Sequence, residues 1–139
     1  MAKTLRLEIV TPEAQTYSDD VDHVVLPSAL GELGIYPNHV PLLTELQPGE
    51  LRVIKNGQES ALAVGEGFAE ITATHVSVLT DMAIEEANIN EEAVQAAIAR
   101  AEAAIRERDK LNAEELATVE AALQKSLAQL RVKRRRTVR

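Results

Sequence analysis

Short runs of alternating apolar and polar side chains follow one another from the N-terminus to about Asp81, and this pattern predicts β-strands. Leu5, Leu7 and Ile9 alternate with charged residues, as in a strand that is buried on one face. The pair Asn56-Gly57 is a strong signal for a two-residue hairpin turn. Short strands at a spacing of roughly 8–12 residues predict a sandwich or barrel, and we expect an antiparallel β-sandwich. The further strands are expected over residues 21–26, 51–55, 61–64, 68–71 and 75–79.

The pattern changes beyond Asn88, because residues 89–136 contain no Gly and no Pro and are rich in Ala and Glu. One helix is expected to begin at an N-cap formed by Asn88 or Asn90. Its apolar residues fall on one helical face: Val94, Ala97, Ile98, Ala101 and Ile105.

A break is expected over residues 109–112, followed by a second helix. Asn112 and Glu115, three residues apart, match a capping box at the start of a helix. The apolar stripe of this helix has nearly heptad spacing and consists of Leu116, Val119, Leu123, Leu127 and Leu130.

Two amphipathic helices joined by a short connection predict an antiparallel helical hairpin. The fold class is therefore α+β in two parts, with a β-sandwich over residues 1–84 and a two-helix hairpin over residues 85–139. Two helices of this length bury their stripes poorly against each other alone, so the hairpin needs a third surface. Either it stays docked on its own sandwich, or it docks there in one state and on a partner in another.

The composition narrows the class of function. Apolar residues are mostly small aliphatics, with one Phe, two Tyr and no Trp, which favours a thin sandwich over a deep catalytic pocket. The chain has no Cys, and His23, His39 and His75 are far apart in sequence, so we expect no metal site. The absence of a nucleophile elbow or phosphate loop argues against an enzyme. No run reaches the ~20 apolar residues of a membrane span, and a soluble protein that is not exported is expected.

Charge is distributed unevenly along the chain. The net charge is −7, yet the last nine residues hold six basic side chains and no acid. Residues 1–130 carry 22 acidic and nine basic side chains, a net charge of −13. An acidic body makes nucleic-acid binding unexpected, whereas a basic end indicates an acidic target.

The run GELGIYPNHVPLLT from Gly31 to Thr44 is similar to the signature of the ATP synthase epsilon subunits, G-[EQ]-[LI]-G-[IV]-x-P-x-H-x-P. The segments QPGELR at 47–52 and GEGFAEI at 65–71 also resemble the family, although its members usually have Gly-Gly where Glu66-Gly67 stands. The resemblance covers essentially the whole chain. It implies a non-catalytic subunit of the rotary ATP synthase with a β-sandwich and a C-terminal helical hairpin.

By this resemblance, the sandwich lies at the foot of the central stalk and binds the gamma subunit and the c ring. Gly31 and Gly34 are expected to permit tight turns. Pro37 and Pro41 are expected to stiffen a loop over residues 31–42. Two simpler alternatives stay open: Glu32 as a solvated turn carboxylate, and His39 as a loop histidine bonded to nearby backbone. The implied partner-binding residues are Gly31, Glu32, Leu33, Gly34, Ile35, Tyr36, Pro37, His39, Pro41 and Leu42.

The resemblance also implies inhibition of ATP hydrolysis, through a hairpin that leaves the sandwich and reaches the alpha and beta catalytic subunits. Such a hairpin needs a basic end that binds carboxylates, and arginine does so in bidentate geometry. The alternative is a solvated tail that favours the helix macrodipole. The implied inhibitory tip consists of Arg131, Lys133, Arg134, Arg135 and Arg136.

Some relatives bind ATP through an [IL]-D-x-x-R-A pattern at the start of the first helix. Here Asn90 replaces the aspartate and Ala93 the arginine, and only Arg100 matches the later part of the pattern. We therefore expect no nucleotide site and no cofactor. The location implied is the cytoplasmic face of a bacterial plasma membrane or the stromal face of a thylakoid membrane, with membrane contact only through the complex. An enzyme built on the sandwich and a stand-alone adaptor protein are the alternatives to this interpretation.

Overall fold

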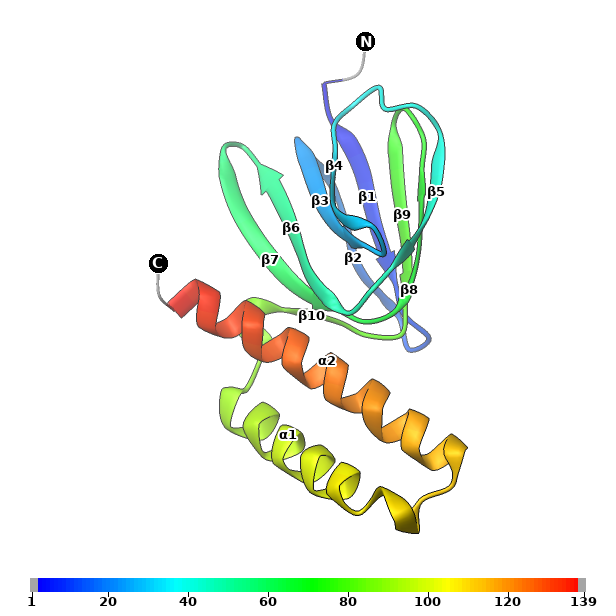
Figure 1. Ribbon diagram of the computed structural model, residues 1–139. Helices are drawn as coiled ribbons and strands as arrows, with labels where there is room; N and C mark the ends of the chain where they lie inside the picture. Colours follow the sequence, from blue (N-terminus) through cyan, green and yellow to red (C-terminus); the bar gives the residue numbers. More distant parts are fainter. Residues whose placement is uncertain (1–2, 138–139) are drawn as a thin grey trace.

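The computed structural model describes residues 3–137, with side chains up to Arg135. This part of the chain forms ten strands and then two α-helices, α1 (Glu91–Arg106) and α2 (Ala113–Thr137), with short 3-10 turns at Glu86–Asn88 and Arg108–Lys110 (Figure 1). The strands are β1 (Leu5–Val10), β2 (Gln15–Val21), β3 (His23–Ser28), β4 (Gly31–Ile35), β5 (Leu42–Leu46), β6 (Gly49–Lys55), β7 (Gln58–Val64), β8 (Gly67–Ile71), β9 (His75–Thr80) and β10 (Ala83–Glu85).

The strands form one continuous sheet that folds over a common core to make a β-sandwich. Their order is β10-β7-β6-β3-β5-β8-β9-β1-β2, with β4 paired to β3. The predicted fold class is confirmed, with one addition: β1 and β9 are parallel, and Leu7 lies opposite Val76. The core is aliphatic and almost completely buried, and its largest side chains are Leu5, Leu7, Ile9, Leu26, Ile35, Leu46, Leu51, Leu62 and Ile71.

Two turns decide how the strands connect. Asn56 and Gly57 have φ angles of 52° and 76°, so the predicted tight turn joins β6 to β7. Gly31 has φ 115° and follows the turn from β3 into β4. The expected loop over residues 31–42 is wrong in its first half, because residues 31–35 pair with β3 as strand β4. Gly34 pairs with Val25 inside this strand and has no positive φ, so it forms no turn.

The helix ends follow the predicted capping. The side chain of Asn90 accepts a hydrogen bond from the N–H of Ala93 at 3.1 Å. At the start of α2, the Asn112 side chain accepts from the N–H of Glu115 at 2.8 Å, and the Glu115 carboxylate accepts from the N–H of Asn112 at 3.0 Å. Both polar groups of the capping box are therefore satisfied reciprocally.

The helical hairpin is docked on the sandwich. Helix α2 lies between the sandwich and α1 and packs on β6 and β7 (Figure 1). The proposed boundary between residues 84 and 85 falls inside β10, which still pairs with β7. A second apolar core joins the two parts and consists of Ala61, Ala63, Ile89, Val94 and Val132, with Met82, Ile84, Ile98 and Leu130 at its edge.

Docking uses a second face of α2 that the heptad stripe did not predict. The stripe residues Leu116 to Leu130 are half-buried, whereas Ser126, Ala128 and Val132 are the buried positions of α2. Small side chains at this face let the helix approach the strands closely, and alanine alone gives little apolar signal in a sequence.

Among the described residues, no helix is both long enough and apolar enough to cross a membrane.

Candidate functional site

Only some of the side chains in the signature segment, residues 31–44, are exposed. Ile35 is completely buried in the sandwich core, and Leu33 packs against that core. Of the residues proposed to bind partners, these two therefore support the surface from inside. Six further side chains of the proposed set are exposed or partly exposed around strand β4 and the following loop: Glu32, Tyr36, Pro37, His39, Pro41 and Leu42.

The loop between β4 and β5 is held by contacts at both sides. The Tyr36 ring stacks on the His23 ring, with centroids 4.4 Å apart and an interplanar angle of 19°. Asn38 has φ 69°, and its N–H donates to the Ala73 carbonyl at 2.7 Å. The His39 Nδ1 lies 2.6 Å from the Val40 carbonyl oxygen, so Nδ1 carries the proton of this bond. The loop therefore has a defined shape, which a rigid contact surface requires.

Glu32 is paired with a cation rather than simply solvated. Its carboxylate lies 2.5 Å from Nη1 of Arg52, and the same nitrogen lies 3.4 Å from Glu50. Arg52 also pairs through Nε with Glu59 at 3.4 Å. Burial of the Arg52 guanidinium acts to lower its pKa, but the hydrogen bonds and charges of Glu32 and Glu50 outweigh this, and the pKa of Arg52 is raised. One largely buried arginine thus joins three carboxylates.

The basic end of α2 is bound to acidic residues of this same chain. Lys133 pairs with Glu86 at 3.5 Å and Arg134 with Glu91 at 3.2 Å. Arg135 forms an ion pair with Glu50 on β6, whose side chain is only 6% exposed. These three side chains therefore do not form a free cationic tail, because the docked hairpin pairs them with acidic residues of the same chain. The Arg136 side chain and residues 138–139 lie outside the described residues.

Arg131 lines a cavity of about 380 Å³ between α2 and the sandwich, together with Arg135. The opposite walls come from the β3–β4 and β5–β6 turns and include Glu32 and Glu50. The two sets of predicted residues, the signature strand and the basic tip, therefore lie next to each other. Sequence separation gave no sign of this proximity.

A stripe of exposed apolar side chains crosses the outer face of the sandwich, and sequence analysis missed it. Val10 on β1 lies opposite Leu79 on β9, which lies opposite Phe68 on β8. Leu43 on β5 is the diagonal neighbour of Phe68, since Glu45 pairs with Phe68 and Leu43 with Glu70. We call Leu43, Phe68, Leu79 and Val10 the apolar stripe; their exposed fractions are 67%, 56%, 57% and 38%. The available signal was the consecutive run Val78-Leu79, which puts apolar side chains on both faces of one strand.

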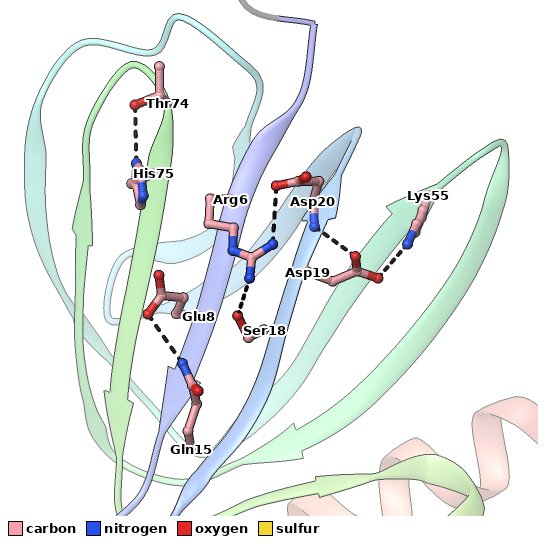
Figure 2. Close-up of polar contacts among 9 residues, drawn as sticks. All are labelled: Arg6, Glu8, Gln15, Ser18, Asp19, Asp20, Lys55, Thr74 and His75. Atoms are coloured by element: carbon pink, nitrogen blue, oxygen red, sulfur yellow. Dashed lines mark hydrogen bonds and ion pairs between the residues drawn. The ribbon is translucent and has the colours of Figure 1, made fainter.

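The same outer face is polar at its other end, as Figure 2 shows. Arg6 donates to Ser18 at 2.7 Å and pairs with Asp20 at 3.4 Å. Asp19 is on the other face of β2, opposite the buried Leu7, and pairs with Lys55 on β6 at 2.5 Å. Hydrogen bonding from Lys55 is the main cause that lowers the pKa of Asp19. On the outer face, Arg6, Ser18 and Asp20 satisfy one another, so this face is polar beyond the apolar stripe.

Arg100 is the one residue that the sequence offered for nucleotide binding. Arg100 is exposed on α1 and is the one charged residue lining a cavity of about 300 Å³ between the two helices. A triphosphate needs several cations or backbone donors. Within residues 3–137, no group of three or more potential His, Cys, Asp or Glu ligands is arranged to hold a metal ion.

Comparison with known proteins identifies the family. Residues 4–86 match the family model described as "ATP synthase, Delta/Epsilon chain, beta-sandwich domain". The chain belongs to this family.

Full-length relatives agree with the match. The ATP synthase epsilon chain of Herpetosiphon aurantiacus is 42% identical over 128 residues, covering 92% of this chain and 93% of the relative. The epsilon chain of Chloroflexus aggregans is 43% identical, covering 92% of this chain and 91% of the relative. A chain in the structure of the Euglena gracilis mitochondrial ATP synthase, described as OSCP/F1/c-ring, has the same fold, with a TM-score of 0.77 and 18% identity over 100% of this chain and 84% of that one.

The resemblance found in the sequence is therefore confirmed. The protein is an epsilon subunit of the rotary ATP synthase, a non-catalytic subunit of a membrane-associated complex.

Proposed function

We propose that the sandwich joins the gamma subunit to the c ring in the central stalk, so that both turn as one rotor. The observation that carries this proposal is the apolar stripe, which runs from Leu43, next to the signature loop, across four strands to Val10. Soluble proteins rarely leave such a continuous apolar surface on one face without a partner. The stripe is proposed to bind gamma, and the Glu32 side of the signature segment to bind the c ring.

The sheet itself makes this surface suitable for transmitting torque. Each stripe residue lies within a hydrogen-bonded strand, and the opposite face of the same strands packs into the aliphatic core through residues such as Ile9, Val78 and Ala69. Moving the stripe relative to the signature strand would therefore require breaking strand pairs or the core. Phe68 at the centre of the stripe is an aromatic side chain, and such side chains bury large apolar areas and contribute strongly to the binding free energy of interfaces.

Substitution of the stripe tests the gamma contact. Replacing Phe68 and Leu79 by Ser is expected to weaken binding of purified gamma by roughly 10- to 100-fold, because each is a central apolar contact. Leu30→Ser is the matched control, since Leu30 is 99% exposed at the β3–β4 turn and lies outside the stripe. Binding is measured by titration calorimetry. Equal affinity of the stripe variant and the wild type would contradict the proposal.

We also propose that the hairpin inhibits ATP hydrolysis when its basic end reaches an acidic segment of the alpha and beta subunits. The contacts of Lys133, Arg134 and Arg135 with this chain's own carboxylates support this, because the same cations can exchange one set of carboxylates for another. Each exposed pair is worth at most about 1 kcal/mol, so several must act together. The docked hairpin is then the non-inhibiting state.

Deletion of residues 131–139 tests the inhibitory role. ATPase activity of the assembled complex is expected to rise, because the released hairpin loses the cations that bind the catalytic subunits. Added salt is expected to raise the ATPase activity of the wild-type complex, since salt screens exposed ion pairs. The difference in activity between the wild-type and the truncated complex should therefore become smaller. Unchanged ATPase activity after deletion would refute inhibition through this tip.

The complex is proposed to lie on the cytoplasmic face of a bacterial plasma membrane or the stromal face of a thylakoid membrane, with this subunit touching the membrane only through its partners.

A further inference from the structure

Glu50 is a carboxylate that the docked hairpin helps to bury. It stands on β6 with 7% of its surface exposed, and it is bound by Arg52 from its own strand and by Arg135 from α2. A charge removed from water to this degree is stable only when cations and hydrogen bonds compensate it. Arg135 therefore contributes to holding α2 on the sandwich, beyond the apolar contacts of Val132 and its neighbours.

Arg52 is shared between Glu50 and the exposed Glu32. A single nitrogen, Nη1, lies 2.5 Å from Glu32 and 3.4 Å from Glu50. The shorter contact is the one to Glu32, whose side chain is 59% exposed, while the longer one goes to the buried Glu50. The two carboxylates thus compete for one donor, and Glu32 holds the better geometry in the docked state.

We propose that Arg52 couples occupation of Glu32 by a cationic partner to release of the α2 hairpin. When a partner's cation takes Glu32, Arg52 Nη1 is free to bind Glu50 at full strength, and Glu50 depends less on Arg135. Helix α2 is then held more weakly and its basic end becomes available. The inference rests on the proposed function, in which the Glu32 side of the signature segment meets the c ring.

Linkage requires the effect to run in both directions. Release of α2 removes Arg135 from Glu50, which draws Arg52 toward Glu50 and leaves Glu32 without its cation. Glu32 then binds a partner's cation more tightly. The hairpin and the signature strand therefore act on each other through two residues of β6, with no change in the fold of the sandwich.

The isolated full-length chain allows a direct test, because it has no native cysteine. Spin labels are placed on Gln58→Cys at the start of β7 and on Gln124→Cys on α2, both exposed positions. The docked fraction is read as the narrow component of the distance distribution between the two labels. All variants are compared in a Val132→Ala background, which weakens docking so that both populations can be measured.

Neutralising Glu32 imitates its occupation by a cation. Glu32→Gln is expected to lower the docking equilibrium constant by a factor of about 2 to 5, the size of a partly exposed ion-pair effect. Glu70→Gln, an exposed acid on β8 with the same change in charge, is the matched control and is expected to leave the constant unchanged. Arg135→Gln is expected to lower docking more strongly than Glu32→Gln. Unchanged docking in either Glu32→Gln or Arg135→Gln would overturn the proposal.

A double-mutant cycle identifies the path of the coupling. In a Glu50→Gln chain, Glu32→Gln is expected to have no further effect, because the carboxylate that competes for Arg52 is gone. An equal loss of docking in the Glu50→Gln background would show that the effect bypasses Glu50 and would overturn the proposal.

Purified c rings in detergent form a separate arm. They are expected to lower the docked fraction of the chain with Glu32 and to leave that of Glu32→Gln unchanged. Absence of c-ring binding would refute the proposed function while leaving the coupling to be decided by the isolated chain. Binding of c rings without any change in the docked fraction would overturn the coupling itself.

Discussion

Gly67 on β8 has no room for a Cβ beside the backbone of β9, and Gly67→Ala therefore tests how the sandwich is packed. Gly67 begins β8 and pairs with Thr80. A Cβ at this position would lie 1.9 Å from the Leu79 carbonyl oxygen and 2.8 Å from the carbonyl carbon of Leu79 and the Cα of Thr80. These are backbone atoms, which cannot rotate away as a side chain can. The two strands must therefore separate locally.

The size of the effect follows from two costs. Inserting a methyl group into a packed site costs about 1–3 kcal/mol. Local separation of the strands also weakens a backbone hydrogen bond, which contributes about 1 kcal/mol. We therefore expect Gly67→Ala to lower the free energy of unfolding by roughly 2–4 kcal/mol.

Gly34→Ala is the matched control for this substitution. Gly34 also lies in a strand, but a Cβ there would have Tyr36 Cε2 at 3.8 Å as its nearest neighbour, an ordinary contact. We expect the free energy of unfolding of Gly34→Ala to stay within about 1 kcal/mol of wild type. Any change should favour Ala, because Ala leaves the unfolded chain less conformational entropy than Gly does. Urea denaturation of the isolated full-length chain, followed by circular dichroism, gives both values. A Gly67→Ala chain as stable as Gly34→Ala would refute the packing described for β8 and β9.

Three further predictions concern single contacts. Val132→Ala removes two buried methyl groups, which contribute about 1.5 kcal/mol to the docking free energy. The docking equilibrium constant in the spin-label experiment is therefore expected to fall roughly tenfold. Unchanged docking would mean that Val132 does not join the two parts. Asn112→Ala is expected to cost about 1 kcal/mol of stability by removing the N-cap of α2, whereas Asn112→Asp keeps the acceptor and is expected to lie near wild type in the same urea experiment. Lys55→Met is expected to raise the pKa of Asp19, measured by NMR titration, because the hydrogen bond that lowers it is lost. The stability from this pair is present above the ordinary carboxyl pKa and is lost as the pH falls through the lowered pKa of Asp19, so the acid-induced loss of stability should be smaller in Lys55→Met.

Local features of the fold were predictable because neighbouring residues produce them. The turn at Asn56-Gly57 and the capping box at Asn112 and Glu115 depend on φ preferences and hydrogen bonds within a few residues. Strand β4 was missed because its two glycines, with the prolines that follow, indicated a loop. The pairing of Leu33 and Ile35 with β3 outweighs that local signal.

Contacts between distant segments were not predictable in the same way. Arg135 and Glu50 are 85 positions apart, and Glu50 follows Pro48-Gly49 as an acidic residue of a turn would. The apolar stripe was hidden for a related reason, since Val10, Phe68 and Leu79 each look like ordinary strand residues and gain a common surface only through the sheet order. The partner-binding role of the signature residues came from the family resemblance, not from their chemistry alone.

The proposed physical link between gamma and the c ring through this subunit can be tested by reconstitution. Purified c rings immobilised in detergent micelles are incubated with gamma, with and without the chain, and the retained proteins are quantified by mass spectrometry. We expect gamma to be retained together with the wild-type chain in equal amounts, and to be lost when the chain is omitted or carries Ser at Phe68 and Leu79. Retention of the same amount of gamma without the chain, or a retained complex from which the chain is absent, would show that this subunit does not join gamma to the c ring.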